Sequence, residues 1–118
     1  MYKQIKKMYE RAVLSGGEKY LPIDELQDYI KTCNSLGIAI IAVDFFMVKG
    51  KSVQPLEALS GFDASILFDE KQDKFQNVTS CNSFILNCYE KSRYSLQGFY
   101  FTSVVEYEEL FWNLTAVI

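Results

Sequence analysis

The chain contains one long apolar stretch, IAIIAVDFFMV, at residues 38–48. Most of its residues are β-branched or aromatic, and these residue types are enriched in β-strands. Apolar side chains would occupy both faces of such a strand, which is typical of a central strand covered on both sides over most of its length. We therefore expect residues 38–48 to form the central strand of a sheet.

The residues that follow predict a short return strand. The segment 49–52 (KGKS) predicts a turn, and Val53 begins the strand after it. Because proline has no N–H to donate to a ladder, Pro55 confines this strand to an edge or ends it. Residues 56–62 predict either one helical turn or an irregular loop, and residues 64–68 are compatible with another strand.

Residues 99–108 predict the last strand, because the pattern of their side chains fits the two-residue repeat of a β-strand. One face would carry Phe99, Phe101, Ser103, Val105 and Tyr107, and the other Tyr100, Thr102, Val104, Glu106 and Glu108. Residues 109–118 are apolar and either extend the sheet or cover the core.

Three segments have the apolar periodicity of amphipathic helices, at residues 2–15, 22–36 and 77–89. Gly16-Gly17 is expected to end the first helix, since glycine commonly follows a helix end. Helices come first, then strands, one helix and a final strand, an order that predicts an α+β fold rather than alternating βαβ units. We expect a single domain, residues 1–118, in which an antiparallel sheet has two N-terminal helices and one later helix packed on it.

The composition is that of a folded chain without a membrane span. The 118 residues are 49% hydrophobic, and no apolar run approaches the roughly 20 residues that a membrane helix needs. Charged residues follow the basic N-terminus where a secretion signal would have an apolar region. Cys33, Cys81 and Cys88 lack metal or redox spacing, which favours buried, reduced thiols. We expect a cytoplasmic protein.

The charge of −3 is unevenly distributed along the chain. Residues 1–20 carry +3, residues 21–70 carry −5 from eight acids and three lysines, and residues 71–118 carry −1. Phosphate binding requires clustered Lys and Arg. The acidic middle of the chain therefore argues against a nucleic acid partner and fits a basic one.

The chain lacks the residues of most catalytic sites. It contains no histidine, which is the commonest general base and metal ligand. No phosphate-binding loop or dinucleotide fingerprint occurs, and the cysteines do not have zinc spacing. We therefore expect a protein without cofactor, metal or catalytic residues. A carboxylate-only hydrolase site, formed by Asp44 with Glu106 or Glu108, remains an alternative.

Carboxylates and aromatic residues are the candidate partner-binding groups. Asp44 interrupts the apolar strand, so it either ends the buried part, pairs with a base such as Lys51 or Arg93, or faces a binding surface. Acids at the other positions are either solvated or directed at a cationic partner, and Tyr and Trp are frequent in interface hot spots. The candidates are Asp44, Asp63, Asp69, Glu70, Tyr100, Glu106, Glu108 and Trp112.

One part of the chain resembles a known group of proteins. The strand that closes on Asp44-Phe45-Phe46, the turn Lys49-Gly50-Lys51, Pro55 and then Gly61-Phe62-Asp63 resemble small bacterial immunity proteins. These are encoded beside polymorphic toxins, including those of contact-dependent growth inhibition systems. The late helix and the strand from Phe99 to Glu106 are similar to that group as well. The resemblance leaves out residues 1–20 and supplies no catalytic residues.

The resemblance implies a cytoplasmic protein that binds and occludes a cognate toxin domain. A nuclease toxin presents a cationic surface to phosphate, and acidic groups on an inhibitor can occupy that surface and accelerate association. We expect a basic C-terminal toxin domain as partner, and a monomer or homodimer when the chain is alone. The other hypothesis is a homo-oligomeric or adaptor module, in which an aromatic sheet edge pairs with a second copy.

Overall fold

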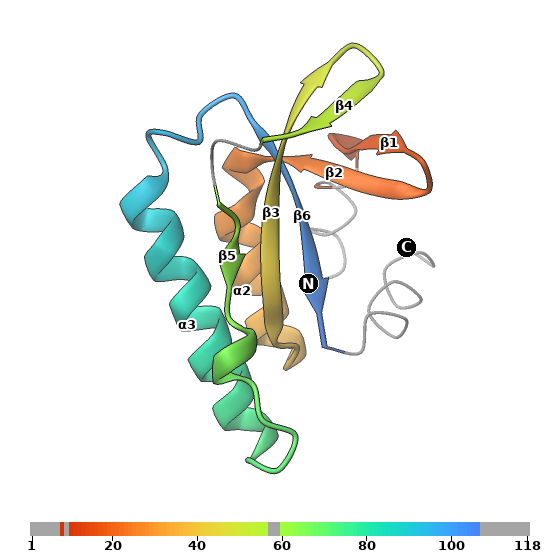
Figure 1. Cartoon of the computed structure of the whole chain (residues 1–118). Helices are drawn as coiled ribbons and strands as arrows, with labels where there is room; N and C mark the ends of the chain where they lie inside the picture. The colour runs from red at the N-terminus through yellow and green to blue at the C-terminus, as the bar shows by residue number, and fades with distance from the viewer. Residues whose placement is uncertain (1–7, 9, 57–59, 107–118) are drawn as a thin grey trace.

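The computed structural model describes residue 8 and residues 10–56 and 60–106. Along these residues a hairpin and an α-helix are followed by a second hairpin, a short strand, a second α-helix and a final strand (Figure 1). The elements are β1 (Val13–Ser15), β2 (Glu18–Pro22), η1 (Ile23–Glu25), α2 (Leu26–Leu36), β3 (Ile40–Lys49), β4 (Ser52–Pro55), β5 (Phe62–Asp63), η2 (Ser65–Leu67), α3 (Lys74–Ser92) and β6 (Tyr100–Val105).

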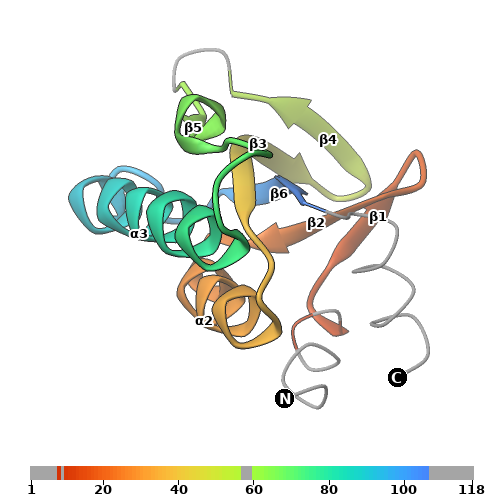
Figure 2. The ribbon, with the colours of Figure 1, turned by 90° about the horizontal axis from the view of Figure 1, so that it is seen from below.

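The strands form one antiparallel sheet in the order β1-β2-β6-β3-β4. The short strand β5 also pairs with β3, on the edge opposite β6 and next to β4. β3 is therefore the central strand, as the apolar stretch predicts, and β4 with Pro55 is an edge strand. The sheet is strongly twisted, so that the β1–β2 and β3–β4 hairpins both curve away from the helices (Figure 2).

Helices α2 and α3 lie side by side on one face of the sheet (Figure 2). The register places Val43 and Phe45 of β3 beside Ser103 and Phe101 of β6 on this face. All but Ser103 are buried, and they form the core with the apolar stripes of the helices. The expected alternation of side chains between two faces is confirmed for residues 100–105, whereas Glu106, expected on the face of Tyr100 and Thr102, instead lies on the helix side near Cys81. The burial of the Cys33 and Cys81 thiols is confirmed as well, and Cys88 is half-buried.

A buried asparagine fastens the two helices to the central strand. Asn82 of α3 is 1% exposed. Its Oδ1 accepts a hydrogen bond from the Ile40 N–H at 2.7 Å, and its Nδ2 donates to the Ile38 carbonyl at 3.0 Å. Nδ2 also donates to Asn34 Oδ1 of α2 at 2.6 Å. One side chain thus connects α2, α3 and the start of β3.

The expectation of two N-terminal helices is wrong. Val13–Ser15, the end of the first expected helix, is strand β1, and it pairs with β2 through Val13–Tyr20 and Ser15–Glu18. The reason is the glycine pair, since Gly16 and Gly17 both have positive φ, 58° and 80°. Two such residues form the tight turn of a β-hairpin. The glycine pair that is expected to end a helix therefore forms the turn of a β-hairpin instead. Residues 1–7 and 9 lie outside the described residues.

The other expected elements are largely confirmed. The second helix begins as η1 after Pro22 and continues as α2 to Gly37, whose φ of 69° closes it. α3 extends the expected helix 77–89 at both ends. Residues 64–68 are not a strand but contain the 3-10 helix η2. Asp63 Oδ1 accepts the Ser65 N–H at 2.9 Å, and this local hydrogen bond turns the backbone out of the sheet.

Candidate functional site

A hollow of about 620 Å³ opens at the end of the sheet where β3 begins and β6 finishes. We call it the end hollow. Its walls come from the start of β3, from η2 and the loop 69–73, from the first turn of α3, and from the residue after β6. The lining residues are Ile41, Ser65, Phe68, Glu70, Gln72, Lys74, Asn77 and Glu106.

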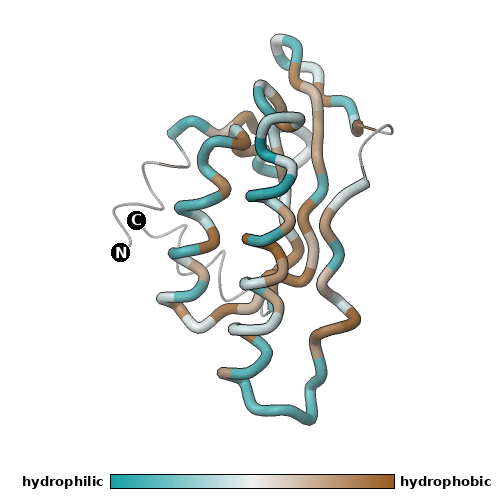
Figure 3. Tube along the Cα trace, turned by 90° about the vertical axis from the view of Figure 1, so that its left-hand side faces the viewer, coloured by the Kyte–Doolittle hydropathy of each residue, from teal (hydrophilic) through white to brown (hydrophobic). Residues whose placement is uncertain are grey.

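The loop 69–73 is held in place by a buried asparagine. Asn77 is 2% exposed. Its Nδ2 donates to the Asp69 carbonyl at 2.9 Å, and its Oδ1 accepts from the Asp69 N–H at 3.0 Å and from Gln72 Nε2. Gln72 Nε2 also donates to the Leu67 carbonyl at 3.1 Å. These contacts fix a loop that is continuously hydrophilic (Figure 3) and hold Glu70 at the rim of the end hollow.

Glu106 supplies a second carboxylate to the end hollow. It directly follows β6, and its N–H donates to the Ala39 carbonyl at 2.8 Å, which keeps its backbone against the sheet. Its Oε2 is buried and has no hydrogen-bond partner among the described residues. Burial raises the pKa of the Cys81 thiol, and the charge of Glu106 raises it further. The carboxylate therefore lies close to the core of the protein.

The sheet face opposite the helices carries a separate group of candidate residues. Asp44 lies opposite Thr102, and Tyr100 lies opposite Phe46. The ring of Phe46 also packs edge-on against Tyr20, with 4.8 Å between centroids. We call this surface the outer face. Asp44 is exposed on it, and its Oδ1 lies 2.6 Å from the position that a Cβ on Gly61 would occupy.

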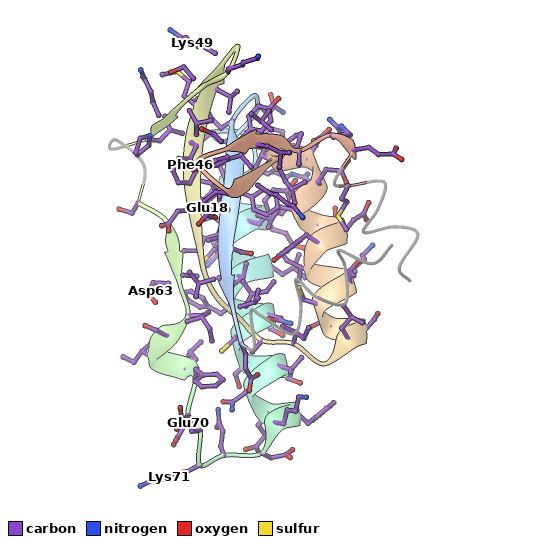
Figure 4. The ribbon with its side chains drawn as sticks, turned by 90° about the vertical axis from the view of Figure 1, so that its right-hand side faces the viewer. Glu18, Phe46, Lys49, Asp63, Glu70 and Lys71 are labelled. Atoms are coloured by element: carbon purple, nitrogen blue, oxygen red, sulfur yellow. The ribbon has the colours of Figure 1, made fainter. Side chains whose placement is uncertain are left out.

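Asp63 belongs to the outer face at the edge formed by β5. It pairs with Ala42 and is exposed. Hydrogen bonds from the side chain and the backbone N–H of Ser65 lower the pKa of its carboxyl group. Figure 4 shows Asp63 and Glu70 along the same margin of the molecule, with Lys71 beside Glu70 and Lys49 at the far tip of the β3–β4 hairpin. Negative groups therefore follow the β5 margin down to the end hollow.

The predicted candidates therefore separate into two locations. Glu70 and Glu106 line the end hollow, whereas Asp44, Asp63 and Tyr100 lie on the outer face. Asp69 serves the loop itself, because its Oδ1 accepts the Lys71 N–H at 2.9 Å. Two further candidates, Glu108 and Trp112, lie outside the described residues.

Asp44 is neither at the end of its strand nor paired with a base in the part of the chain that the structure describes. The ion pairs found there join Arg11 to Asp24 at 3.1 Å and to Glu25 at 2.5 Å. Lys51 and Arg93 are therefore not partners of Asp44. Asp44 is instead exposed within strand β3.

The pairing of Asp44 with Glu106 in a hydrolase site is not favoured by this arrangement, and the pairing with Glu108 lies outside the described residues. Asp44 lies opposite Thr102, which precedes Glu106 by four residues, or about 13 Å along a strand. Glycosidase carboxylates stand roughly 5–9.5 Å apart. The two acids also belong to different surfaces, the outer face and the end hollow.

Exposed apolar residues beside the end hollow are the main feature that sequence reasoning missed. In η2, which contributes Ser65 to the wall, Ile66 is 90% exposed and Leu67 is 38% exposed. Their sequence is compatible with a strand, and no signal in it pointed to an exposed apolar surface. Asn77 carried no signal either, because its role depends on a loop that the sequence leaves undefined. An acidic hollow with exposed apolar neighbours suits contact with another protein.

The described residues contain no cluster of three or more Cys, Asp and Glu residues able to hold a metal ion. None of their helices is both long enough and apolar enough to cross a membrane.

Comparisons of the chain with protein-family models, with curated proteins and with solved structures find no match.

Proposed function

We propose that the chain is an immunity-type inhibitor, which binds a cognate toxin domain in the bacterial cytoplasm and blocks it. The observation that carries the proposal is the end hollow, where Glu70 and Glu106 line one cavity beside the exposed Ile66 and Leu67. Such a surface offers both negative charge and apolar area to a partner. The resemblance of residues 38–67 to small immunity proteins points to the same class.

A basic toxin domain, and in particular a nuclease, is the partner that this surface suits best. Nucleases bind phosphate through clustered Lys and Arg. The acids at Asp63, Glu70 and Glu106 would meet those cations and accelerate association through their charge. Occlusion of the active site would follow from the bulk of the bound inhibitor, without any chemistry by the chain.

The test is capture of the product of the neighbouring upstream reading frame. We expect the tagged full chain to retain this product when the two are expressed together, and to protect cells from its toxicity. The double variant Glu70→Gln/Glu106→Gln should weaken retention. Glu90→Gln, which removes an exposed acid of α3 away from the hollow, should leave it unchanged. Absence of a complex with the unmodified chain would overturn the proposal.

A second candidate, self-association, is favoured by the position of β1 at the end of the sheet. Among the described strands β1 pairs only with β2, and Leu14 on it is 71% exposed. Edge strands with exposed apolar residues can pair with a second copy. Sedimentation separates the hypotheses, because an adaptor module of this kind requires a self-associated species and an inhibitor does not.

A further inference from the structure

We infer that the end hollow is a binding site for one arginine side chain of a partner protein. The guanidinium group would lie against the carboxylates of Glu106 and Glu70, with the aliphatic part of the side chain along Ile41 and Phe68. This inference deepens the proposed function and rests on it for the source of the arginine. It names the chemistry of the contact and the residue on which the contact depends.

The size of the end hollow allows this occupant. Its volume of about 620 Å³ falls within the range of roughly 300–1,000 Å³ that is typical of ligand sites. An extended side chain would fill only part of it, so the backbone that carries the arginine can also approach. The loop 69–73 is already held by Asn77, and one wall of the site is therefore formed before binding.

The buried oxygen of Glu106 is the strongest argument that the end hollow binds a ligand. Oε2 is shielded from solvent but accepts no hydrogen bond among the described residues. A buried carboxylate oxygen without a partner is destabilising. The residue as a whole is only half-buried, so a rotation of its side chain can turn the carboxylate into the hollow. There a ligand that brings both an N–H donor and a positive charge would satisfy it, and a charge-assisted hydrogen bond of this kind is stronger than a neutral one.

The remaining walls favour arginine over a small cation or a lysine. Ile41 and Phe68 are apolar surfaces that a free metal ion cannot use. Guanidinium is planar, stacks on aromatic rings and donates to more than one acceptor at once. An arginine additionally gains from its stem and from its several donors.

The experiment is an NMR titration of the full chain with N-acetyl-arginine methylamide. We expect saturable amide shifts that concentrate at residues 65–72 and at Glu106. The lysine analogue should bind more weakly, and the citrulline analogue, which has a similar shape but no charge, should cause no such shifts. Glu106→Gln should lower the affinity for the arginine probe by about tenfold or more. The Glu90→Gln variant should bind the probe like the unmodified chain.

The outcomes separate this inference from the proposed function. A folded chain that shows no saturable shift at these amides overturns the arginine site, as does equal binding of the citrulline analogue. Capture of the toxin that is unaffected by Glu106→Gln overturns the site but leaves the inhibitor proposal standing. Arginine binding that Glu106→Gln weakens, in a chain that captures no toxin, supports the site and overturns the proposed function.

Discussion

Two buried asparagines on α3 occupy very different surroundings. Asn82, in the middle of the helix, bonds to Ile38, Ile40 and Asn34, which are 42 to 48 residues away along the chain. Asn77, near the start, bonds within the local loop, to residues five and eight positions before it. The middle of α3 therefore joins distant elements, while its first turn shapes the end hollow. The buried Asn82 side chain therefore contributes to the stability of the whole fold, whereas the buried Asn77 side chain holds a surface loop in place.

The largest effect should come from removing the long-range asparagine. Asn82→Ala leaves the Ile40 N–H and the Ile38 carbonyl without their side-chain partner in the core. Each buried polar group left unsatisfied costs about 1–3 kcal/mol, so the free energy of unfolding should fall by about 2–5 kcal/mol in urea denaturation. Asn87→Ala, at an exposed position of the same helix, should change it by about 0.5 kcal/mol or less.

A loss below about 1 kcal/mol for Asn82→Ala would contradict this division of roles. It would mean that water or a shift of α3 replaces the side chain at little cost, and that the three elements are joined mainly by apolar contacts.

The local asparagine should matter less for stability and more for the site. Asn77→Ala removes the clamp on the Asp69 backbone. The freed groups can reach solvent once the loop opens, so the free energy of unfolding should fall by about 1–2 kcal/mol. Hydrogen exchange should become faster at residues 69–72 and remain slow in β3. Equally fast exchange in both regions would show that the two ends of α3 are not independent.

The same comparison explains what could be predicted from the sequence. The central strand, the second and third helices and the two faces of residues 100–105 follow from side-chain periodicity, which directly reflects burial. Gly16-Gly17 was misread because glycine suits both a helix end and a hairpin turn, and only the pairing partner distinguishes them. The end hollow could not be predicted from the sequence, since it forms only where Glu106 and the loop at Glu70, which are distant along the chain, line the same cavity.

Replacing the Glu106 carboxylate in the end hollow should raise the stability of the fold, whereas replacing either asparagine should lower it. Glu106→Gln removes a charge whose Oε2 has no partner among the described residues. The free energy of unfolding should therefore rise by about 0.5–1.5 kcal/mol at pH 7, measured by urea denaturation. The matched change Glu90→Gln, at an exposed position, should leave it within about 0.5 kcal/mol. A clear loss of stability in Glu106→Gln would show that the carboxylate is structurally required.

The smallest effect concerns Asp63, at the margin between the outer face and the end hollow. Its pKa lies below the ordinary value because the Ser65 side chain and backbone N–H bond to its charged form. A lowered folded pKa contributes stability that is present above the unfolded value of about 3.9 and is lost as the pH falls through the folded value. Ser65→Ala removes the larger cause, so an NMR titration should show the pKa of Asp63 move up toward the ordinary value. Ser80→Ala, on the exposed side of α3, should leave the pKa of Asp63 unchanged. If Ser65→Ala also leaves this pKa unchanged, the whole effect comes from the backbone turn that leads from the sheet into the hollow.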